Sequence, residues 1–211
     1  MKPRRFLLLG GGGHASVVAD AMRACGHEVV GFIDDGPVTP TASESIGAPF
    51  LGGTSQLWDL LGSLEQSAEV FPAVGSNADR RHLIETLQRN RQPEAQPIAH
   101  PSAYIAANTR LEALVFVGPR AIVNTGAVVC QGAMINSGAI VEHDCLVGQL
   151  AHIAPGAILC GAAKIGESAL IGAGAVVLPG VKIGEYATLG AGAVANKDVD
   201  AGQVSVGVPA R

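Results

Sequence analysis

The sequence has few aromatic residues, little charge and no long apolar run. Aromatic residues make up 4% and charged residues 15% of its 211 residues. No apolar run approaches the roughly 18 residues that a membrane-spanning helix needs. The basic start at 2–5 leads into only four apolar residues before a run of glycines, which argues against a signal peptide. We therefore expect a cytoplasmic protein without a membrane span.

The charge balance and the cysteines narrow the functional classes further. The formal net charge is −4, which argues against a nucleic-acid-binding groove. None of the four cysteines belongs to a C-x-x-C pair, so we expect reduced thiols that act as small apolar residues. These cysteines are Cys25, Cys130, Cys145 and Cys160.

The dominant feature of the sequence is a six-residue repeat between Ile105 and Val194. From Ile105 to Leu189 every sixth residue is Ile, Leu or Val, fifteen in all. The residue four positions later is small, with Ala at eleven of the fifteen, except at Val115 and Val181. This period is typical of a parallel β-helix, in which each hexad supplies one face of a triangular prism. Three hexads make one coil, so the repeat predicts five coils. Glycines directly after the aliphatic residue, such as Gly118 and Gly166, are expected to adopt backbone angles that a side chain would penalise.

The part of the chain before the repeat has the order of a nucleotide-binding βαβ unit. A strand at 6–9 is followed by a glycine run at 10–13, a helix to about residue 25, a second strand at 28–33 and an acidic pair. Glycines let a ligand approach the backbone, and a helix N-terminus favours an anion. The alternative is a tight turn without a ligand. The unit is half of a dinucleotide fold, so a single nucleotide fits better than NAD.

Two further elements complete this Rossmann-like domain, which we place at 1–98, with the β-helix domain at 99–211. A short helix capped by Thr54 follows a loop at 36–53. A third strand at 69–74 ends in Gly75-Ser76-Asn77 and leads into an amphipathic helix at 78–90. Arg80 and Arg81 lie on this helix. They could meet a phosphate, but on a helix of mixed charge we expect them to face solvent.

Polar residues interrupt the small apolar rhythm of the repeat in one region. His143 holds the third position of its hexad, at a corner, where its side chain points outward. An adjacent carboxylate, Asp144 or Glu142, can orient the imidazole and stabilise its protonated form, as a general base requires. His152 lies half a coil further on. The alternative is that both histidines are ordinary surface residues. The spacing of His143, Asp144 and His152 does not match a compact zinc site, so we expect no metal.

The whole chain resembles a family of bacterial nucleotide-sugar N-acetyltransferases with hexapeptide repeats, which acetylate UDP- or GDP-linked 4-amino sugars. Relatives of that family are described as sialic acid O-acetyltransferases. Besides the hexads, the resemblance rests on a Gly-Gly-His segment, an Asp-Asp pair, a Gly-Ser-Asn loop, a Glu-His-Asp-Cys stretch and the closing Gly-Val-Pro-Ala. It implies a left-handed parallel β-helix after a Rossmann-like half-domain, and a homotrimer.

The resemblance also implies roles for single residues. His143 is expected to be the catalytic base, with Asp144 as its orienting partner and Glu142 able to share that role. The expected nucleotide-sugar contacts are Gly12, Gly13, His14, Asp34, Asp35 and Gly75. Acetyl-CoA is expected to contact His152, Ala173 and Ala191. Apart from the resemblance, our mechanistic hypothesis adds Gly161 to the acetyl-CoA contacts, with its backbone N–H meeting the tetrahedral oxyanion.

The sequence thus predicts an acetyl-CoA-dependent N-acetyltransferase acting on the 4-amino group of a nucleotide-linked deoxysugar, for surface glycan biosynthesis. Two alternatives remain. One is an O-acyltransferase acting on sialic acid or another sugar hydroxyl. The other is a non-catalytic trimeric scaffold that binds a nucleotide.

Overall fold

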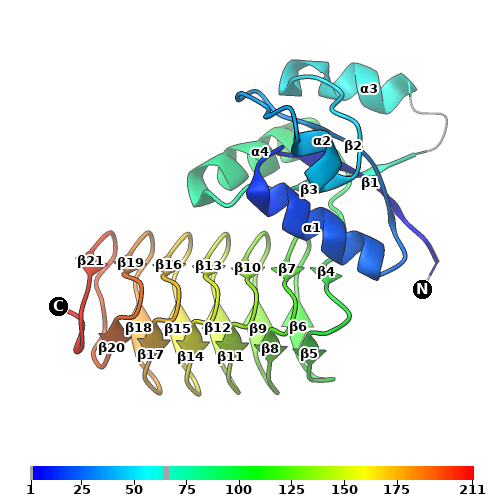
Figure 1. The fold of residues 1–211 in the computed structure, drawn as a ribbon. Coiled ribbons are helices and arrows are strands. Elements are labelled where there is room, and N and C mark those ends of the chain that lie inside the picture. The colour runs from blue at the N-terminus through cyan, green and yellow to red at the C-terminus, as the bar shows by residue number, and fades with distance from the viewer. Residues whose placement is uncertain (1, 64–66) are drawn as a thin grey trace. The chain divides into compact units, whose positions relative to one another are not determined.

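The computed structural model describes residues 2–63 and 67–211. The chain divides into two compact units, Met1–Ala95 and Gln96–Arg211, whose elements are labelled in Figure 1. Within the described residues, no helix combines the length and the apolar character needed to cross a membrane.

The first unit is built on a three-stranded parallel sheet in the order β2-β1-β3. Its strands are β1 (Arg5–Leu9), β2 (Glu28–Ile33) and β3 (Glu69–Pro72). The three predicted strands are therefore present, although β3 ends two residues early. Because the strands are parallel, their carboxyl ends and the loops that follow them meet at one edge of the sheet.

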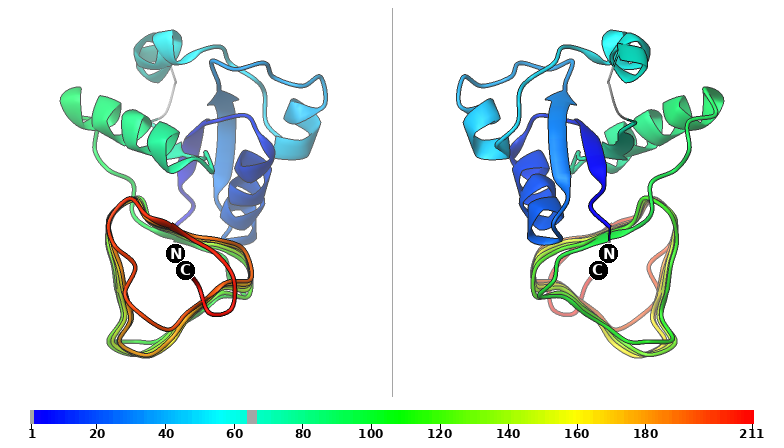
Figure 2. Two further views of the ribbon diagram at one scale, coloured as in Figure 1. Left: turned by 90° about the vertical axis from the view of Figure 1, so that its left-hand side faces the viewer. Right: turned by 90° about the vertical axis from the view of Figure 1, so that its right-hand side faces the viewer.

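Among the described residues of this unit, four α-helices and one 3₁₀ helix accompany the sheet. They are α1 (Gly13–Ala24), α2 (Ala42–Ile46), η1 (Thr54–Gln56), α3 (Leu57–Ser63) and α4 (Asn77–Arg89). Figure 2 shows α1 and α2 on one face of the sheet and α4 on the other. Leu57 of α3 and Leu87 of α4 pack with Leu7, Leu9 and Ile33 in one buried cluster.

The sequence missed two features of this unit. Helix α2 lies within the stretch at 36–53 that was expected to be a loop. Thr54 does not cap the helix that follows it, because Gly53 holds the cap position and the Thr54 hydroxyl donates a hydrogen bond to Asp35 instead.

The second unit is a parallel β-solenoid with three faces, each a ladder of two-residue strands. Viewed along its axis, the coils superpose as a triangle (Figure 2). The seven-stranded face contains β4 (Ile98–Ala99), β7 (Phe116–Val117), β10 (Met134–Ile135), β13 (His152–Ile153), β16 (Leu170–Ile171), β19 (Thr188–Leu189) and β21 (Val204–Ser205). The six-stranded face contains β5 (Tyr104–Ile105), β8 (Ile122–Val123), β11 (Ile140–Val141), β14 (Ile158–Leu159), β17 (Val176–Val177) and β20 (Val194–Ala195). The five-stranded face contains β6 (Arg110–Leu111), β9 (Val128–Val129), β12 (Leu146–Val147), β15 (Lys164–Ile165) and β18 (Lys182–Ile183).

The aliphatic repeat forms the interior of the solenoid, as predicted. Thirteen of the fifteen repeat positions, from Val117 to Leu189, are 0–2% exposed, and the alanines of the repeat are buried beside them. The ladder runs beyond the predicted coils because β4 and β21 also pair into the seven-stranded face. There Ala99 pairs with Val117 and Ser205 pairs with Leu189, so neither end shows the aliphatic signal.

The glycines that directly follow the aliphatic residues serve a purpose other than the predicted one. A Cβ added to Gly166 would lie 2.5 Å from the backbone nitrogen of Glu185, and one added to Gly172 would lie 2.5 Å from that of Ala191. These positions need glycine because the next coil passes too close for a side chain. The left-handed conformation occurs two residues later in the corner, for example at Gly156, where φ is +69°.

The two classes of glycine predict different costs of substitution. We expect Gly166→Ala to lower the free energy of unfolding by about 3 kcal/mol, because a methyl group must push the backbone of a neighbouring coil away. Gly156→Ala should cost about 1 kcal/mol, since an added Cβ meets nothing within 4 Å and only the left-handed angle is penalised. Guanidinium unfolding followed by far-ultraviolet circular dichroism measures both, and equal losses would contradict this distinction.

Candidate functional site

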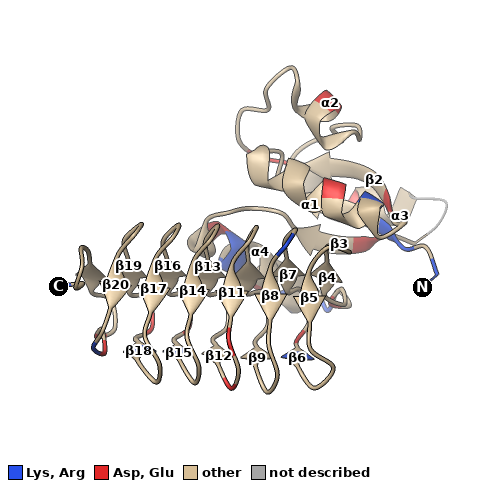
Figure 3. Ribbon diagram, turned by 60° about the horizontal axis from the view of Figure 1, so that its bottom comes forward, with Lys and Arg blue, Asp and Glu red and all other residues tan. Residues whose placement is uncertain are grey.

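The corner between β11 and β12 carries the predicted acid–base pair. His143 Nδ1 lies 2.9 Å from Asp144 Oδ2, and their side chains are 57% and 67% exposed. Asp144 occupies the left-handed position of the corner, with φ +59°, a conformation that Asp tolerates better than most side chains. The hydrogen bond at Nδ1 leaves Nε2 of the imidazole available to exchange a proton with a ligand. Acidic residues mark this turn in Figure 3.

Gly161 lies directly beneath the His143 imidazole. It holds the same corner position one coil later, and a Cβ added there would lie 2.5 Å from His143 Nε2. With the imidazole in this position, residue 161 has room for glycine only. Among the residues that the structure describes, the Gly161 amide donates to no protein acceptor, so it is available to a ligand.

Glu142 contacts Asn124 and not His143, the partner that its position in the sequence suggested. Its Oε2 accepts a hydrogen bond from Asn124 Nδ2 at 3.0 Å, one coil below. Asp144, and not Glu142, is thus the carboxylate that hydrogen-bonds His143.

His152 lies on the seven-stranded face, whereas the His143 corner joins the other two faces. Its Nε2 is 3.3 Å from Asn136 Nδ2. The Asn136 carbonyl oxygen accepts from the Ser137 amide at 2.8 Å, which directs the amino group of Asn136 toward the imidazole. Because an amide nitrogen can only donate, His152 Nε2 is the acceptor in this pair. Within one chain, the structure does not bring His152 to His143.

Ala173 and Ala191 lie at a third place on the solenoid. Both are exposed at the corner between the seven-stranded and six-stranded faces, one coil apart, and the Gly192 amide donates to the Ala173 carbonyl at 2.9 Å. The four residues predicted to contact acetyl-CoA are therefore distributed over one face and two corners of the prism.

Cys145 is unsuited to a nucleophilic role. The residue is 1% exposed, and its Sγ donates to the Cys160 carbonyl at 3.2 Å. Burial raises the pKa of the Cys145 thiol to about 11, so almost none of it is thiolate at neutral pH. This geometry is incompatible with an acyl-enzyme formed on Cys145.

In the first unit, the four glycines after β1 have two different roles. A Cβ on Gly10 would lie 2.7 Å from Val74, and one on Gly11 would lie 2.8 Å from the Phe32 ring, so packing requires both glycines. A Cβ on Gly12 or Gly13 would meet nothing within 4 Å. Gly12 is the N-cap of α1 and Gly13 its first residue, so this exposed backbone faces open space at a helix N-terminus, where an anion is favoured.

The acidic pair after β2 holds the neighbouring loops in place. Asp34 accepts the Gly11 amide at 2.6 Å and the Gly36 amide at 2.7 Å. Asp35 accepts both the amide and the hydroxyl of Thr54, and these hydrogen bonds hold the pKa of the Asp35 carboxyl below its usual range. Both carboxylates thus organise the loops, and only their remaining lone pairs are available to a ligand.

Arg80 is buried, which corrects the expectation that it faces solvent. It is 2% exposed, and its guanidinium donates to Asn77 Oδ1 at 2.8 Å and to the Val74 carbonyl at 3.3 Å. It thereby supports the loop that contains Gly75. Burial lowers the pKa of Arg80 to about 10. Burial and the Arg80 charge together lower the pKa of His14 to about 4, so His14 is neutral at pH 7.

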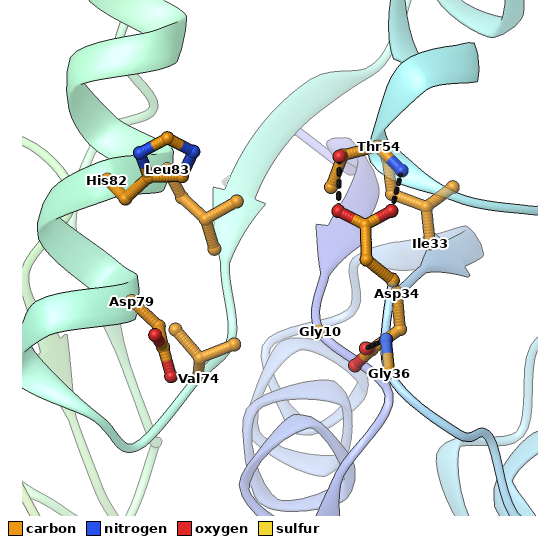
Figure 4. Close-up of a pocket in the computed structure, with 10 residues that line it drawn as sticks. Gly10, Ile33, Asp34, Gly36, Thr54, Val74, Asp79, His82 and Leu83 are labelled. Atoms are coloured by element: carbon orange, nitrogen blue, oxygen red, sulfur yellow. Dashed lines mark hydrogen bonds between the residues drawn. The ribbon is translucent and has the colours of Figure 1, made fainter.

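Among the cavities at the carboxyl edge of the three-stranded sheet, two share Asp34 and Gly36. One, of about 380 Å³, is lined by Gly12 and Gly13 at the start of α1. The other, of about 410 Å³, lies between the Asp34–Asp35 turn and α4 and is drawn in Figure 4. Neither cavity is lined by His14 or Gly75.

The larger cavity includes residues that sequence reasoning missed. Thr54, Asp79 and His82 line it together with the predicted acidic pair. A signal was available for two of them, because a helix that follows a strand begins at the same sheet edge as the other loops. Asp79 and His82, in the first two turns of α4, were therefore candidates from position alone.

Across residues 2–63 and 67–211, no three His, Cys, Asp or Glu side chains are grouped so that they could hold a metal ion.

Two segments of the chain match known families. Residues 5–87 match the PglD N-terminal domain, and residues 162–197 match the bacterial transferase hexapeptide family, described as six repeats.

Solved structures resemble nearly the whole chain. PerB from Caulobacter crescentus, solved with CoA and GDP-perosamine, is 34% identical with a TM-score of 0.89, over 98% of this chain and 95% of that one. The acetyltransferase domain of PglB from Neisseria gonorrhoeae FA1090, solved with acetyl coenzyme A, is 33% identical with a TM-score of 0.88, over 100% and 99%. WeeI from Acinetobacter baumannii AYE, 24% identical over 99% of both chains with a TM-score of 0.84, shares the fold. The predicted half-domain followed by a parallel β-solenoid is confirmed.

The lowered pKa of His14 predicts how the stability of the first unit depends on pH. The folded-state pKa of about 4 lies below the ordinary 6.5. The unfolded chain therefore binds the proton first, and stability falls as the pH drops through this interval. Between pH 7 and pH 5 we expect a loss of about 2 kcal/mol from this group. Urea unfolding followed by the fluorescence of Trp58, the single tryptophan, measures it. A His14→Gln variant with the same pH dependence as the wild type would contradict this assignment.

Proposed function

The chain belongs to the hexapeptide-repeat nucleotide-sugar acetyltransferases, and we propose that it transfers the acetyl group of acetyl-CoA to the 4-amino group of a UDP- or GDP-linked 4-amino-4,6-dideoxysugar. The observation that carries the chemistry is the exposed His143–Asp144 pair, with Nε2 of the imidazole directly above Gly161. A base of this kind suits a proton taken from an attacking amine. We place the reaction in the cytoplasm, where acetyl-CoA is available, and the product in surface glycan biosynthesis.

The proposed mechanism is direct transfer. The neutral 4-amino nitrogen attacks the thioester carbonyl carbon, a C–N bond forms, and His143 Nε2 accepts a proton from the amine. Asp144 stabilises the imidazolium through its 2.9 Å contact with Nδ1. The Gly161 N–H donates to the oxyanion of the tetrahedral intermediate. Collapse of the intermediate breaks the C–S bond, and the leaving CoA thiolate receives the proton from His143.

We assign the two substrates to the two parts of the chain. The nucleotide sugar is assigned to the part before the repeat, 1–98, with Gly12, Gly13, His14, Asp34, Asp35 and Gly75 as its contacts. Two observations support this assignment: the open backbone at Gly12 and Gly13, and the cavities at the carboxyl edge of the sheet. Acetyl-CoA is assigned to the solenoid at 99–211, with contacts at Gly161, His152, Ala173 and Ala191.

We further propose that the active assembly is a homotrimer. One prism holds the predicted acetyl-CoA contacts on one face and two corners, so a neighbouring copy is needed to unite them in one groove. The outward positions of the six-stranded face support such a contact, because every strand presents a large apolar side chain there. These are Tyr104, Ile122, Ile140, Ile158, Val176 and Val194. A column of this kind is typical of a surface that packs against another protein.

Replacing the proposed base tests the reaction. We expect His143→Ala to lower the turnover number about 10²- to 10⁴-fold in a thiol-release assay with acetyl-CoA and UDP- and GDP-linked 4-amino-4,6-dideoxysugars. Cys145→Ala is the matched control, because Ala fills the equivalent position in eleven other hexads, and it should stay within threefold of wild type.

Other outcomes of this assay point elsewhere. A loss below threefold in a folded His143→Ala protein would remove His143 from the mechanism. Turnover with free sialic acid alone would favour O-acylation, and the absence of acetyl-CoA binding to the wild type would favour a scaffold.

Gly161 offers a second test that leaves the base in place. An added Cβ would displace the His143 imidazole, since the nearest atoms belong to that side chain and not to backbone. We expect Gly161→Ala to fold normally and to lower the turnover number about 10- to 100-fold through misplacement of the base. Thermal melting controls for folding, and a fully active variant would show that this contact does not position His143.

A further inference from the structure

The cavity between the Asp34–Asp35 turn and α4 is lined by both apolar and polar side chains. Its volume of about 410 Å³ lies within the range typical of small-molecule sites. Val74 and Leu83 line it with apolar surface, and Figure 4 shows both side chains on the side opposite the acidic turn. The adjoining cavity at the start of α1 offers the exposed backbone that an anion favours. Because the two cavities share Asp34 and Gly36, a nucleotide with its phosphates at α1 can reach α4 with its base.

Some polar groups of this cavity already make hydrogen bonds within the protein, and others are open to a ligand. Asp34 and Asp35 accept hydrogen bonds from Gly11, Gly36 and Thr54. Asp79 is exposed in the first turn of α4, and only its backbone amide takes part in the helix cap, donating to Ser76 Oγ at 3.2 Å. Figure 4 shows its carboxylate on the cavity side of α4. His82 follows three residues later on the same side of the helix, so an acceptor and a possible donor line one wall.

We propose that this cavity binds guanine and that Asp79 selects it, so that the acceptor substrate class is a GDP-linked amino sugar. The inference rests on the proposed function and makes it specific. Guanine carries two adjacent donors, N1–H and the 2-amino group, which one carboxylate accepts together in a charge-assisted pair. Beside them lies the acceptor O6, which matches a donor such as His82.

The other bases do not fit this arrangement. Uracil has one N3–H between two carbonyl oxygens, so a carboxylate that reaches two atoms of that edge meets a lone pair. Adenine has an acceptor at N1 where guanine has a donor. A site built around a carboxylate therefore discriminates against both, because their acceptors are left opposite a negative charge.

Asp79 also has a structural role that the experiment must separate from selection. It is the third residue of α4, where a negative charge stabilises the helix N-terminus. Loss of that effect would weaken the binding of every nucleotide alike. Selection of guanine would instead change the ratio between nucleotides that differ only in the base, and above all between GDP and IDP, which lacks the 2-amino group.

The test is isothermal titration calorimetry of the full-length protein with GDP, IDP and UDP. For the wild type we expect GDP to bind about 10-fold or more tightly than IDP or UDP. Asp79→Asn should weaken GDP binding by a similar factor, leave UDP within about twofold and bring GDP and IDP close to equal affinity. Asp20→Asn, an exposed acid of α1 outside both cavities, is the matched control and should keep the wild-type order.

Each remaining outcome is decisive. Tighter binding of UDP than of GDP by the wild type would overturn the selection of guanine while leaving the acetyltransferase proposal intact. So would an unchanged GDP-to-IDP ratio in Asp79→Asn. If none of the three nucleotides binds, the guanine site and the nucleotide-sugar function are both overturned. The ranking by the wild type needs no variant, so it stands even if Asp79→Asn fails to fold.

Discussion

The close approach of successive coils is the constraint on which the solenoid depends. Strands pair residue for residue with the strand one coil away, as Ile140 does with Ile158, so the coils are only one ladder spacing apart. At that spacing the interior accommodates one stack of aliphatic side chains and one of alanines per face. The outer bends accommodate a glycine where two backbones nearly touch. The low aromatic content follows, since a large ring has no room inside.

The same constraint decides where chemistry can occur. Strand side chains are held by the ladder and the core, whereas the His143 and Asp144 side chains at their corner point outward and are more than half exposed. His143 and Asp144 occupy such a corner, and the strained left-handed position is held there by an aspartate that also orients the imidazole. Gly161, in the next coil, keeps the space under the ring open. The site therefore depends on two coils being in register, although its residues lie eighteen positions apart.

The sequence predicted features that depend on nearby residues and missed those that depend on contacts between distant residues. The aliphatic period and the strands of the first unit were correctly predicted because each is a pattern within a few residues, and the adjacency of His143 and Asp144 needs no folding information. The role of Gly166 was misjudged because its crowding comes from Glu185, in the next coil. Arg80 was expected in solvent because helical charge patterning does not reveal the Val74–Ser76 carbonyls that surround it. The pairing of Asp35 with Thr54 likewise joins residues nineteen apart.

Because each coil has eighteen residues, residues eighteen positions apart occupy the same place around the prism on successive coils. Asn124, Glu142 and Cys160 are equivalent in this sense on three successive coils. Inserting or deleting a whole coil keeps every later side chain on its own face, whereas a change of six residues would rotate all later coils by one face. The length of the prism on either side of the His143 corner can therefore vary by duplication or loss of whole coils while the corner itself is inherited intact.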